Sequence, residues 1–205
     1  MTASWLVVLV AASYGCVAFV GLRLAASVCE KIVPFSDGPR PGTPPSRALL
    51  AGAIVVGALL AARGIPTLEL AVFAILIVSL VSCWYSDVRC GIVPDSFTLV
   101  PLALVLGFAL ANHDVMPVVS ALVVGLPFAG AALLSGGRGV GWGDVKLVAL
   151  GGACLGLQSA VLAFSVACFV AVAIAFMRRR QNEPVAFVPY LAGSMAVAVS
   201  LPGLR

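Results

Sequence analysis

The sequence predicts an all-α polytopic membrane protein, a bundle of about eight transmembrane helices of which one is short. Of the 205 residues, 62% are hydrophobic and only 10% are charged, whereas about 25% of the residues of a soluble domain are charged. The apolar residues also stand in blocks whose length approaches the roughly 20 residues that cross a bilayer as a helix. Because no long polar linker divides the chain, we expect one membrane-embedded domain over residues 1–205.

Three apolar segments occupy the N-terminal part of the chain. Trp5–Val28 is long enough to cross a bilayer, and it lacks the basic start of a cleaved signal peptide, so we expect it in the mature protein. The polar, proline-rich stretch Cys29–Ser46 ends this segment. Arg47–Ala62 and Pro66–Tyr85 follow as the second and third predicted helices.

Five further apolar segments make up the rest of the chain, and the glycine-rich loop Ser135–Gly143 divides them into a group of two and a group of three. The segment that begins at Asp144 is the shortest. It suits a half-membrane helix that lines a polar cavity, where irregular backbone is tolerated. In chain order the five segments are Phe97–Asn112, Val115–Leu134, Asp144–Leu155, Gln158–Met177 and Ala186–Leu201.

Basic residues mark one side of the predicted bundle. When eight spans place successive loops on alternate sides, ten Lys and Arg residues fall on one side and two on the other. Lys and Arg are enriched in cytoplasmic loops. We therefore expect both termini outside the cytoplasm, with Asp87 and Asp144 at the cytoplasmic face of the membrane. The ten residues are Arg23, Lys31, Arg40, Arg47, Arg89, Arg138, Lys146, Arg178, Arg179 and Arg180, and the two are Arg63 and Arg205.

The cysteines and the histidine do not form a metal-site pattern. The six cysteines include no C-x-x-C pair, and His113 is the only histidine, so the ligand spacing of a zinc site is missing. Four of the cysteines lie in apolar segments, where cysteine behaves as a small hydrophobic residue. We expect no metal, no other cofactor, no disulfide framework and, in a chain surrounded by lipid, no nucleic-acid partner.

Two aspartates stand at the ends of apolar helices in a chain that otherwise avoids charge, and such carboxylates are candidate functional groups. Asp144 follows Gly141 and Gly143, which admit a close peptide neighbour and backbone angles closed to other residues. In the first turn of a helix, unpaired N–H groups favour the ionised form of Asp144. The alternative is that Asp144 is a helix cap without chemistry.

Asp87 lies at the C-terminal end of its predicted helix, whereas Asp144 lies at the N-terminal end of another. The negative end of the helix dipole disfavours an anion, and a second carboxylate nearby acts in the same direction, so we expect a raised pKa. The alternative is a solvated interfacial charge paired with Arg89. Pro94 lies in the turn that follows, and Asp95 is interpreted as the cap of the next helix.

A pair of carboxylates with different pKa values provides one acid and one base near neutral pH, which is the chemistry of aspartic proteases. Such a pair activates a water without a covalent intermediate. A serine or cysteine nucleophile beside a base is not apparent, since His113 lies in a loop on the opposite face. A second class of function stays open, namely a small transporter whose aspartates bind a proton or cation.

Small residues are expected to supply the helix packing. Gly151, Gly152 and Gly156 lie close to one helical face, and Gly152 and Gly156 form a small-xxx-small pair that lets helix backbones approach closely. Such faces also permit a homodimer.

Three stretches carry a resemblance to a known family. Asp87–Asp95 joins an aspartate to an Ile-Val-Pro-Asp turn, Gly139–Leu147 contains Gly-x-Gly-Asp-x-Lys-Leu, and Phe187–Gly193 reads Phe-Val-Pro-Tyr-Leu-Ala-Gly. In this order they resemble the prepilin peptidases, membrane aspartyl proteases of the GxGD type that serve type IV pilus, type II secretion and Tad systems. The resemblance covers the chain from about Leu49 onward, so we expect a first helix and loop over 1–48 and a peptidase core over 49–205.

The resemblance implies a substrate and a set of site residues. The substrate is the basic leader of a prepilin or pseudopilin, cut at the cytoplasmic membrane face while the apolar remainder stays in the lipid bilayer. A peptidase for another signal class, such as preflagellins, is the nearest alternative. The implied catalytic residues are Asp87 and Asp144, and the motif residues that support them are Gly141, Gly143, Lys146, Pro94, Pro189 and Tyr190.

The chain departs from the family in its first loop. Many members have a large cytoplasmic loop there, with paired C-x-x-C motifs that bind zinc, and this loop is associated with N-methylation of the new pilin N-terminus. Here the region shrinks to Cys29–Ser46 and has one cysteine, so we expect no methyltransferase activity. The Val188 position is usually glycine in the family.

Charged residues on the expected cytoplasmic face have different predicted roles. Because the leader is basic, we expect Arg178–Arg180 to act as topology anchors and the acidic residues Glu30, Asp37 and Glu183 to contact the leader. Lys146 either anchors its helix at the interface or tunes Asp144, and the sequence does not separate these two roles.

Overall fold

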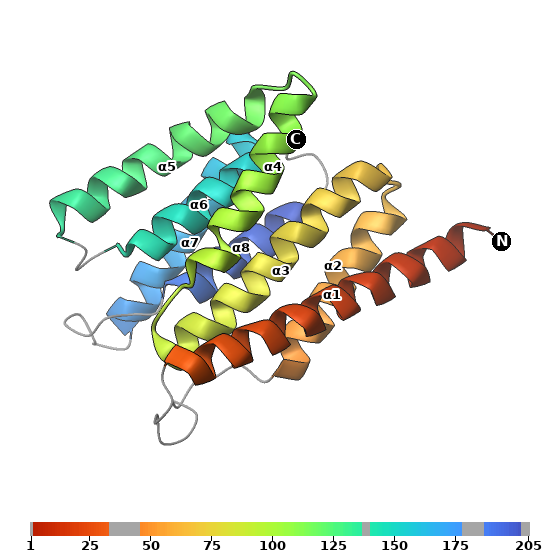
Figure 1. Ribbon diagram of the computed structural model, residues 1–205, viewed down its shortest axis with the longest axis horizontal. Helices are drawn as coiled ribbons and strands as arrows, with labels where there is room; N and C mark the ends of the chain where they lie inside the picture. The colour runs from red at the N-terminus through yellow and green to blue at the C-terminus, as the bar shows by residue number, and fades with distance from the viewer. Residues whose placement is uncertain (1, 33–45, 137–139, 178–186, 202–205) are drawn as a thin grey trace. The chain divides into compact units, whose positions relative to one another are not determined.

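The protein is all-helical in a computed structural model that describes residues 2–32, 46–136, 140–177 and 187–201 (Figure 1). These residues form eight α-helices and one short 3₁₀-helix, η1, which confirms the predicted fold class. The elements are α1 Thr2–Ile32, α2 Ser46–Ala62, α3 Thr67–Cys90, η1 Asp95–Phe97, α4 Leu99–Ala111, α5 Met116–Leu134, α6 Trp142–Leu155, α7 Leu157–Met177 and α8 Val188–Ser200.

Four helices in the described ranges are long and apolar enough to cross a membrane, namely α1, α3, α5 and α7. Three shorter apolar stretches, Ser46–Ala62, Asp95–Ala111 and Val188–Ser200, accompany them, so the chain is a polytopic membrane protein. The expectation of one short helix is wrong, because α4 and α8 have 13 residues each and α6 has 14. The 3₁₀ turn η1 takes up the start of the fourth predicted segment and shortens α4.

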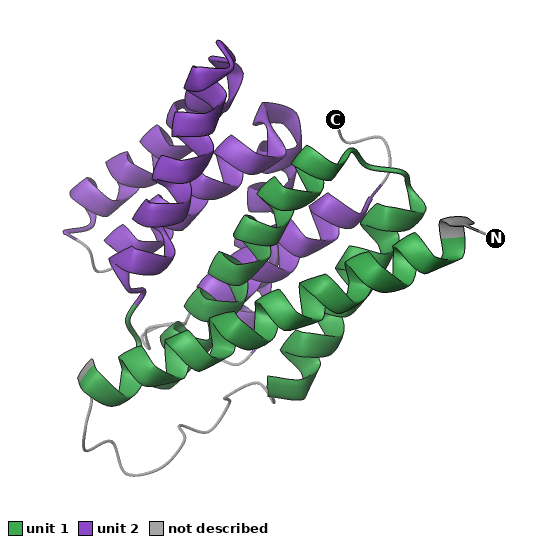
Figure 2. Cartoon of the chain, turned by 45° about the vertical axis from the view of Figure 1, so that its right-hand side comes forward, with its two compact units in different colours: residues 1–92 green, residues 93–205 purple. Residues whose placement is uncertain are grey.

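The first compact unit, residues 1–92, contains α1, α2 and α3 (green in Figure 2), and α1 packs on both other helices. The Tyr14 hydroxyl donates to the carbonyl of Leu70 at 2.7 Å, and the Ser82 hydroxyl donates to the carbonyl of Gly21 at 3.1 Å. Both bonds join α1 to α3. They satisfy polar side chains that lipid cannot satisfy.

The second compact unit, residues 93–205, is arranged around α6, which packs against α4, α5, α7 and α8 (purple in Figure 2). Two glycines of α6 allow these close approaches. A Cβ atom on Gly152 would lie 2.4 Å from a methyl carbon of Val124 in α5, and one on Gly151 would lie 2.8 Å from the end of Met195 in α8. The predicted packing role of these two glycines is confirmed.

Gly156 has a different role from the one expected. It follows the last residue of α6 with φ 77°, a left-handed backbone angle that favours glycine, and a Cβ there would have no neighbour within 4 Å. Its membership of a small-xxx-small packing pair is therefore wrong, because the helix ends before the residue can meet a neighbouring helix. The single-domain organisation, with its division near residue 48, stays a prediction.

Candidate active site

Asp144 is the third residue of α6 and therefore lies in its first turn, as predicted. The Gly141 N–H donates to Asp144 Oδ2 at 3.0 Å, and the Asp144 N–H donates to the Gly141 carbonyl at 3.1 Å. This reciprocal pair caps the start of the helix, where N–H groups lack helical acceptors. Because the cap uses Oδ2, capping and chemistry at the other oxygen are compatible.

Gly141 and Gly143 act through their missing side chains. Gly141 has φ −77° and ψ 152°, an extended conformation that any residue adopts, and Gly143 is part of the helix. A Cβ on Gly141 would lie 3.3 Å from Asp144 Oδ2, and one on Gly143 would lie 2.6 Å from the Cβ of Val93. Both close contacts are with side chains, so the expected close peptide neighbour stays a prediction, whereas the expected special backbone angles are wrong for both glycines.

Burial raises the pKa of the Asp144 carboxyl above its ordinary value of 3.8, and the Gly141 N–H lowers it by less. The group stands at the start of α6, outside the four candidate spans. The expectation that the helix start favours ionised Asp144 is therefore outweighed by desolvation, which favours the neutral form. A carboxyl in this state suits a proton donor or a shared proton.

Asp87 lies in the last turn of α3, so its predicted position at a helix C-terminus is confirmed. Its carboxylate oxygen Oδ2 is buried. Gly91 ends the helix with φ 67° and donates its N–H to the Asp87 carbonyl at 2.8 Å. Gly91 is not among the predicted site residues, although a glycine directly after the last helical turn is the signal of such a cap.

Arg89 is held by an aromatic side chain one turn earlier in α3. Its guanidinium donates to the Tyr85 hydroxyl at 2.5 Å, and its central carbon lies 5.7 Å from the centre of the Tyr85 ring. A cation over an aromatic face is attracted by the ring quadrupole. The charge of Arg89 is thus fixed near the end of the helix that carries Asp87.

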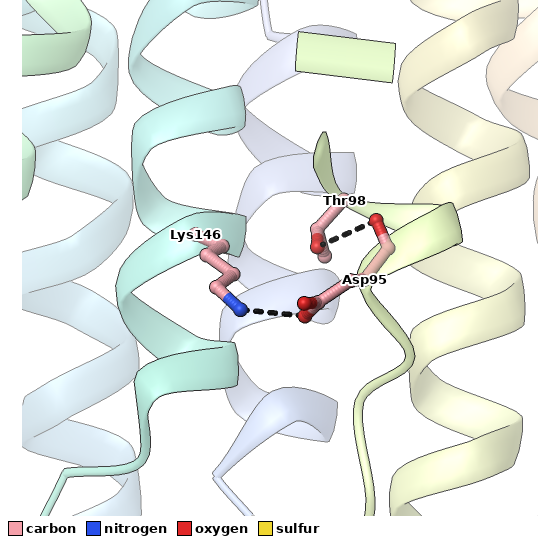
Figure 3. A network of polar contacts seen from close by, with 3 residues as sticks. All are labelled: Asp95, Thr98 and Lys146. Atoms are coloured by element: carbon pink, nitrogen blue, oxygen red, sulfur yellow. Dashed lines mark hydrogen bonds and ion pairs between the residues drawn. The ribbon is translucent and has the colours of Figure 1, made fainter. Parts of the chain in front are cut away.

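Asp95 follows Pro94 and opens the turn η1, where it pairs with Lys146 of α6 (Figure 3). Lys146 Nζ lies 2.5 Å from Asp95 Oδ1, and the Thr98 hydroxyl donates to the Asp95 carbonyl at 3.4 Å. The interpretation of the Asp95 side chain as a helix cap is wrong, because its carboxylate binds an ammonium group on another helix. For Lys146, whose role was open, the structure shows this ion pair.

Pro189 and Tyr190 lie in the first turn of α8 and line a groove of about 340 Å³ between α7 and α8. Its other lining residues are apolar or small. They are Leu162, Ala163, Val166, Ala167, Val170, Gly193, Ser194, Val197, Ala198 and Leu201.

Not all predicted site residues can be followed in the structure. Asp87 belongs to the first compact unit and Asp144 to the second, so their pairing stays a prediction. Glu30 is exposed near the end of α1, whereas Asp37, Glu183 and Arg178–Arg180 lie outside the described residues. Within the described ranges, no three His, Cys, Asp or Glu residues gather in a group that could hold a metal.

Comparison with known proteins identifies the family of this chain. A sequence model described as the type IV leader peptidase family matches residues 74–176, half of the chain and the half that contains both Asp87 and Asp144. The chain belongs to the type IV leader peptidase family.

Relatives within this family include two curated proteins named prepilin leader peptidase/N-methyltransferase, from Burkholderia pseudomallei strains 1026b and K96243. Each is 33% identical to this chain over 173 aligned residues, which cover 75% of this chain and 52% of the relative. The chain therefore spans about half the length of these relatives. No solved structure matches it.

Proposed function

We propose that this family member is a membrane aspartic endopeptidase that removes the basic leader from prepilins or pseudopilins at the cytoplasmic membrane face. One observation carries the proposal: the family match encloses two aspartates that each stand in the terminal turn of an apolar helix. The printed name of the two relatives, prepilin leader peptidase, agrees with this activity.

In the proposed reaction Asp87 and Asp144 share one proton and bind one water between them. The ionised carboxylate takes a proton from the water as its oxygen attacks the scissile carbonyl carbon, and the protonated carboxyl donates to the carbonyl oxygen. The C–N bond of the resulting gem-diol then breaks. One aspartate gives its proton to the leaving nitrogen, the other takes a proton from a gem-diol hydroxyl, and the singly protonated pair is restored.

The proposed orientation follows from the charges. The ten-to-two division of Lys and Arg between the two sides assigns the ends of α3 and α6 that carry Asp87 and Asp144 to the cytoplasm. Glu30, exposed near the end of α1, falls on the same side in this topology and suits contact with a basic leader. The proposal does not extend to methyl transfer, because Cys29–Ser46 replaces the large zinc-binding loop of many family members.

The test is co-expression of the full chain with a candidate prepilin in a bacterial host, with precursor and product followed by gel and mass. Wild type should convert the precursor to a product whose mass shows loss of the leader without an added methyl group. Asp87→Asn and Asp144→Asn should reach the membrane at normal levels and leave the precursor intact. Asp114→Asn is the matched control, because an asparagine oxygen still accepts the Met116 N–H that Asp114 binds at 3.0 Å.

The other outcomes identify the alternatives. Cleavage of a preflagellin-like substrate but of no prepilin would change the substrate class and keep the chemistry. A stable wild-type protein that cuts no precursor would contradict the peptidase proposal. Proton or cation flux into vesicles containing the protein would then be the next measurement, because it tests the transporter class.

A further inference from the structure

Two contacts attach the chain segment Gly91–Thr98, here called the connection, to the start of α6. Lys146 Nζ and Asp95 Oδ1 form the ion pair of Figure 3. Val93 lies against Gly143, where a Cβ would approach the Val93 Cβ to 2.6 Å. Residues 143 and 146 are three positions apart and therefore share one face of α6. The connection runs along this face.

Residues 94–98 of the connection form a compact turn. The Phe97 N–H donates to the Pro94 carbonyl at 3.1 Å, and the Thr98 N–H donates to the Asp95 carbonyl at 3.2 Å. Phe97 and Thr98 are buried. The ion pair of Asp95 therefore holds this hydrogen-bonded turn on α6, and the Val93 contact lies directly before the turn.

Both predicted catalytic aspartates are close in sequence to the residues that make these contacts. Asp87 precedes Val93 by six residues, and Gly91, the cap that accompanies Asp87, is the first residue of the connection. On the other side, Asp144 directly follows Gly143 and precedes Lys146 by two residues. The contacts on α6 therefore lie beside Asp144, and the segment that they hold is the continuation of the turn that carries Asp87.

We infer that the Asp95–Lys146 ion pair is a positioning device that holds Val93–Thr98, the residues that follow the Asp87 helix in sequence, on the start of the helix that carries Asp144. This inference rests on the proposed two-aspartate function. Asp95 is 62% exposed and Lys146 28% exposed, and an exposed pair contributes little to overall stability. Because the Asp95–Lys146 ion pair is inferred to position the connection, we expect its loss to lower the rate of the chemical step.

The test uses purified full-length protein and a prepilin substrate, with kcat and KM measured separately. Lys146→Asp and Asp95→Lys each place like charges at the contact and should lower kcat about fivefold, the upper end of the range for an exposed ion pair, with little change in KM. The double variant Asp95→Lys/Lys146→Asp should recover most of the kcat. Ser96→Lys is the control, because it places the same lysine side chain on an exposed neighbour of Asp95, and it should keep the wild-type kcat.

Amide hydrogen exchange of residues 91–98 is the second readout, and it does not depend on cleavage. Exchange should be faster in both single reversals and return to the wild-type rate in the double variant. Unchanged kcat and exchange in the single reversals, or a double variant as impaired as they are, would overturn the inference. So would a rise in KM at constant kcat, which would make Asp95 a leader contact. If wild type cuts no prepilin, the proposed function fails, and exchange alone decides whether the ion pair holds the connection.

Discussion

Gly143→Ala tests whether the fit between the connection and α6 matters for catalysis. The new Cβ would lie 2.6 Å from the Val93 Cβ and 3.0 Å from its Cγ2, whereas carbon atoms pack at about 3.5–4.0 Å. The added Cβ is fixed to the α6 backbone, and the Cβ of Val93 is fixed to the backbone of the connection. Because neither atom can rotate away, the connection must move by about 1 Å to restore a normal carbon–carbon distance. A misplacement of that size can lower a rate about 100-fold.

The effect on stability should be much smaller than the effect on the rate. Overpacking costs about 1–3 kcal/mol, and alanine in a helix interior recovers about 1 kcal/mol relative to glycine. The variant should therefore fold and reach the membrane. The assay is kcat for prepilin cleavage by purified protein, with the thermal unfolding midpoint measured on the same samples.

Two further variants make the Gly143 prediction specific. Val93→Gly removes the atoms that the new methyl group meets, so Gly143→Ala/Val93→Gly should recover much of the kcat lost in Gly143→Ala. Gly130→Ala in α5 is the control, because nothing lies within 4 Å of its added Cβ, and it should cut like wild type. Wild-type kcat in Gly143→Ala, or no recovery in the double variant, would refute this reasoning.

Three predictions concern stability and can be measured by thermal unfolding in detergent. Gly152→Ala should destabilise the fold by about 1–3 kcal/mol because its Cβ would lie 2.4 Å from an α5 side chain. Gly107→Ala is the control and should be neutral or stabilising, because nothing lies within 4 Å of its added Cβ. Equal effects of the two substitutions would contradict the described packing. Asp144→Asn should raise the unfolding midpoint at pH 7. Because burial raises the pKa of Asp144, ionisation destabilises the wild-type fold above that pKa. The difference should shrink as pH falls and vanish well below the ordinary pKa of 3.8, where the carboxyl is protonated in both states; a difference that persists there would rule out this cause. Tyr14→Phe should cost about 1 kcal/mol through loss of the bond to Leu70, and no change would mean that this bond contributes nothing.

The helices could be predicted from the sequence because apolar runs and their breaks are local signals. The seventh predicted segment, Gln158–Met177, differs from the observed α7, Leu157–Met177, by one residue. The small number of residues in α4 was harder to predict. The 3₁₀ turn η1 lies at the start of the same apolar run, and nothing in the sequence distinguishes it from the first turn of the helix. Gly156 shows the same limit, because a glycine that packs and a glycine that ends a helix are the same letter in a sequence.

The positions of the candidate site residues along the chain could be predicted from the sequence, but their contacts with other helices could not. The positions of Asp87 and Asp144 at helix ends follow from local patterns. The pairing of Asp95 with Lys146 joins residues that are 51 positions apart, and one sequence contains no signal for such a contact. The raised pKa of Asp144 was missed for a related reason, since desolvation depends on neighbouring elements rather than on the helix start alone.

Asp87 and Asp144 are proposed to act as one catalytic pair. The most direct measurement is the rate of prepilin cleavage by purified Asp87→Asn, Asp144→Asn and the double variant, each compared with wild type and Asp114→Asn. Each single variant should lose at least about 100-fold in kcat, and the double variant should be no slower than the singles because the two residues act as a unit. A single variant that retains near wild-type kcat, or losses that multiply in the double variant, would contradict the claim.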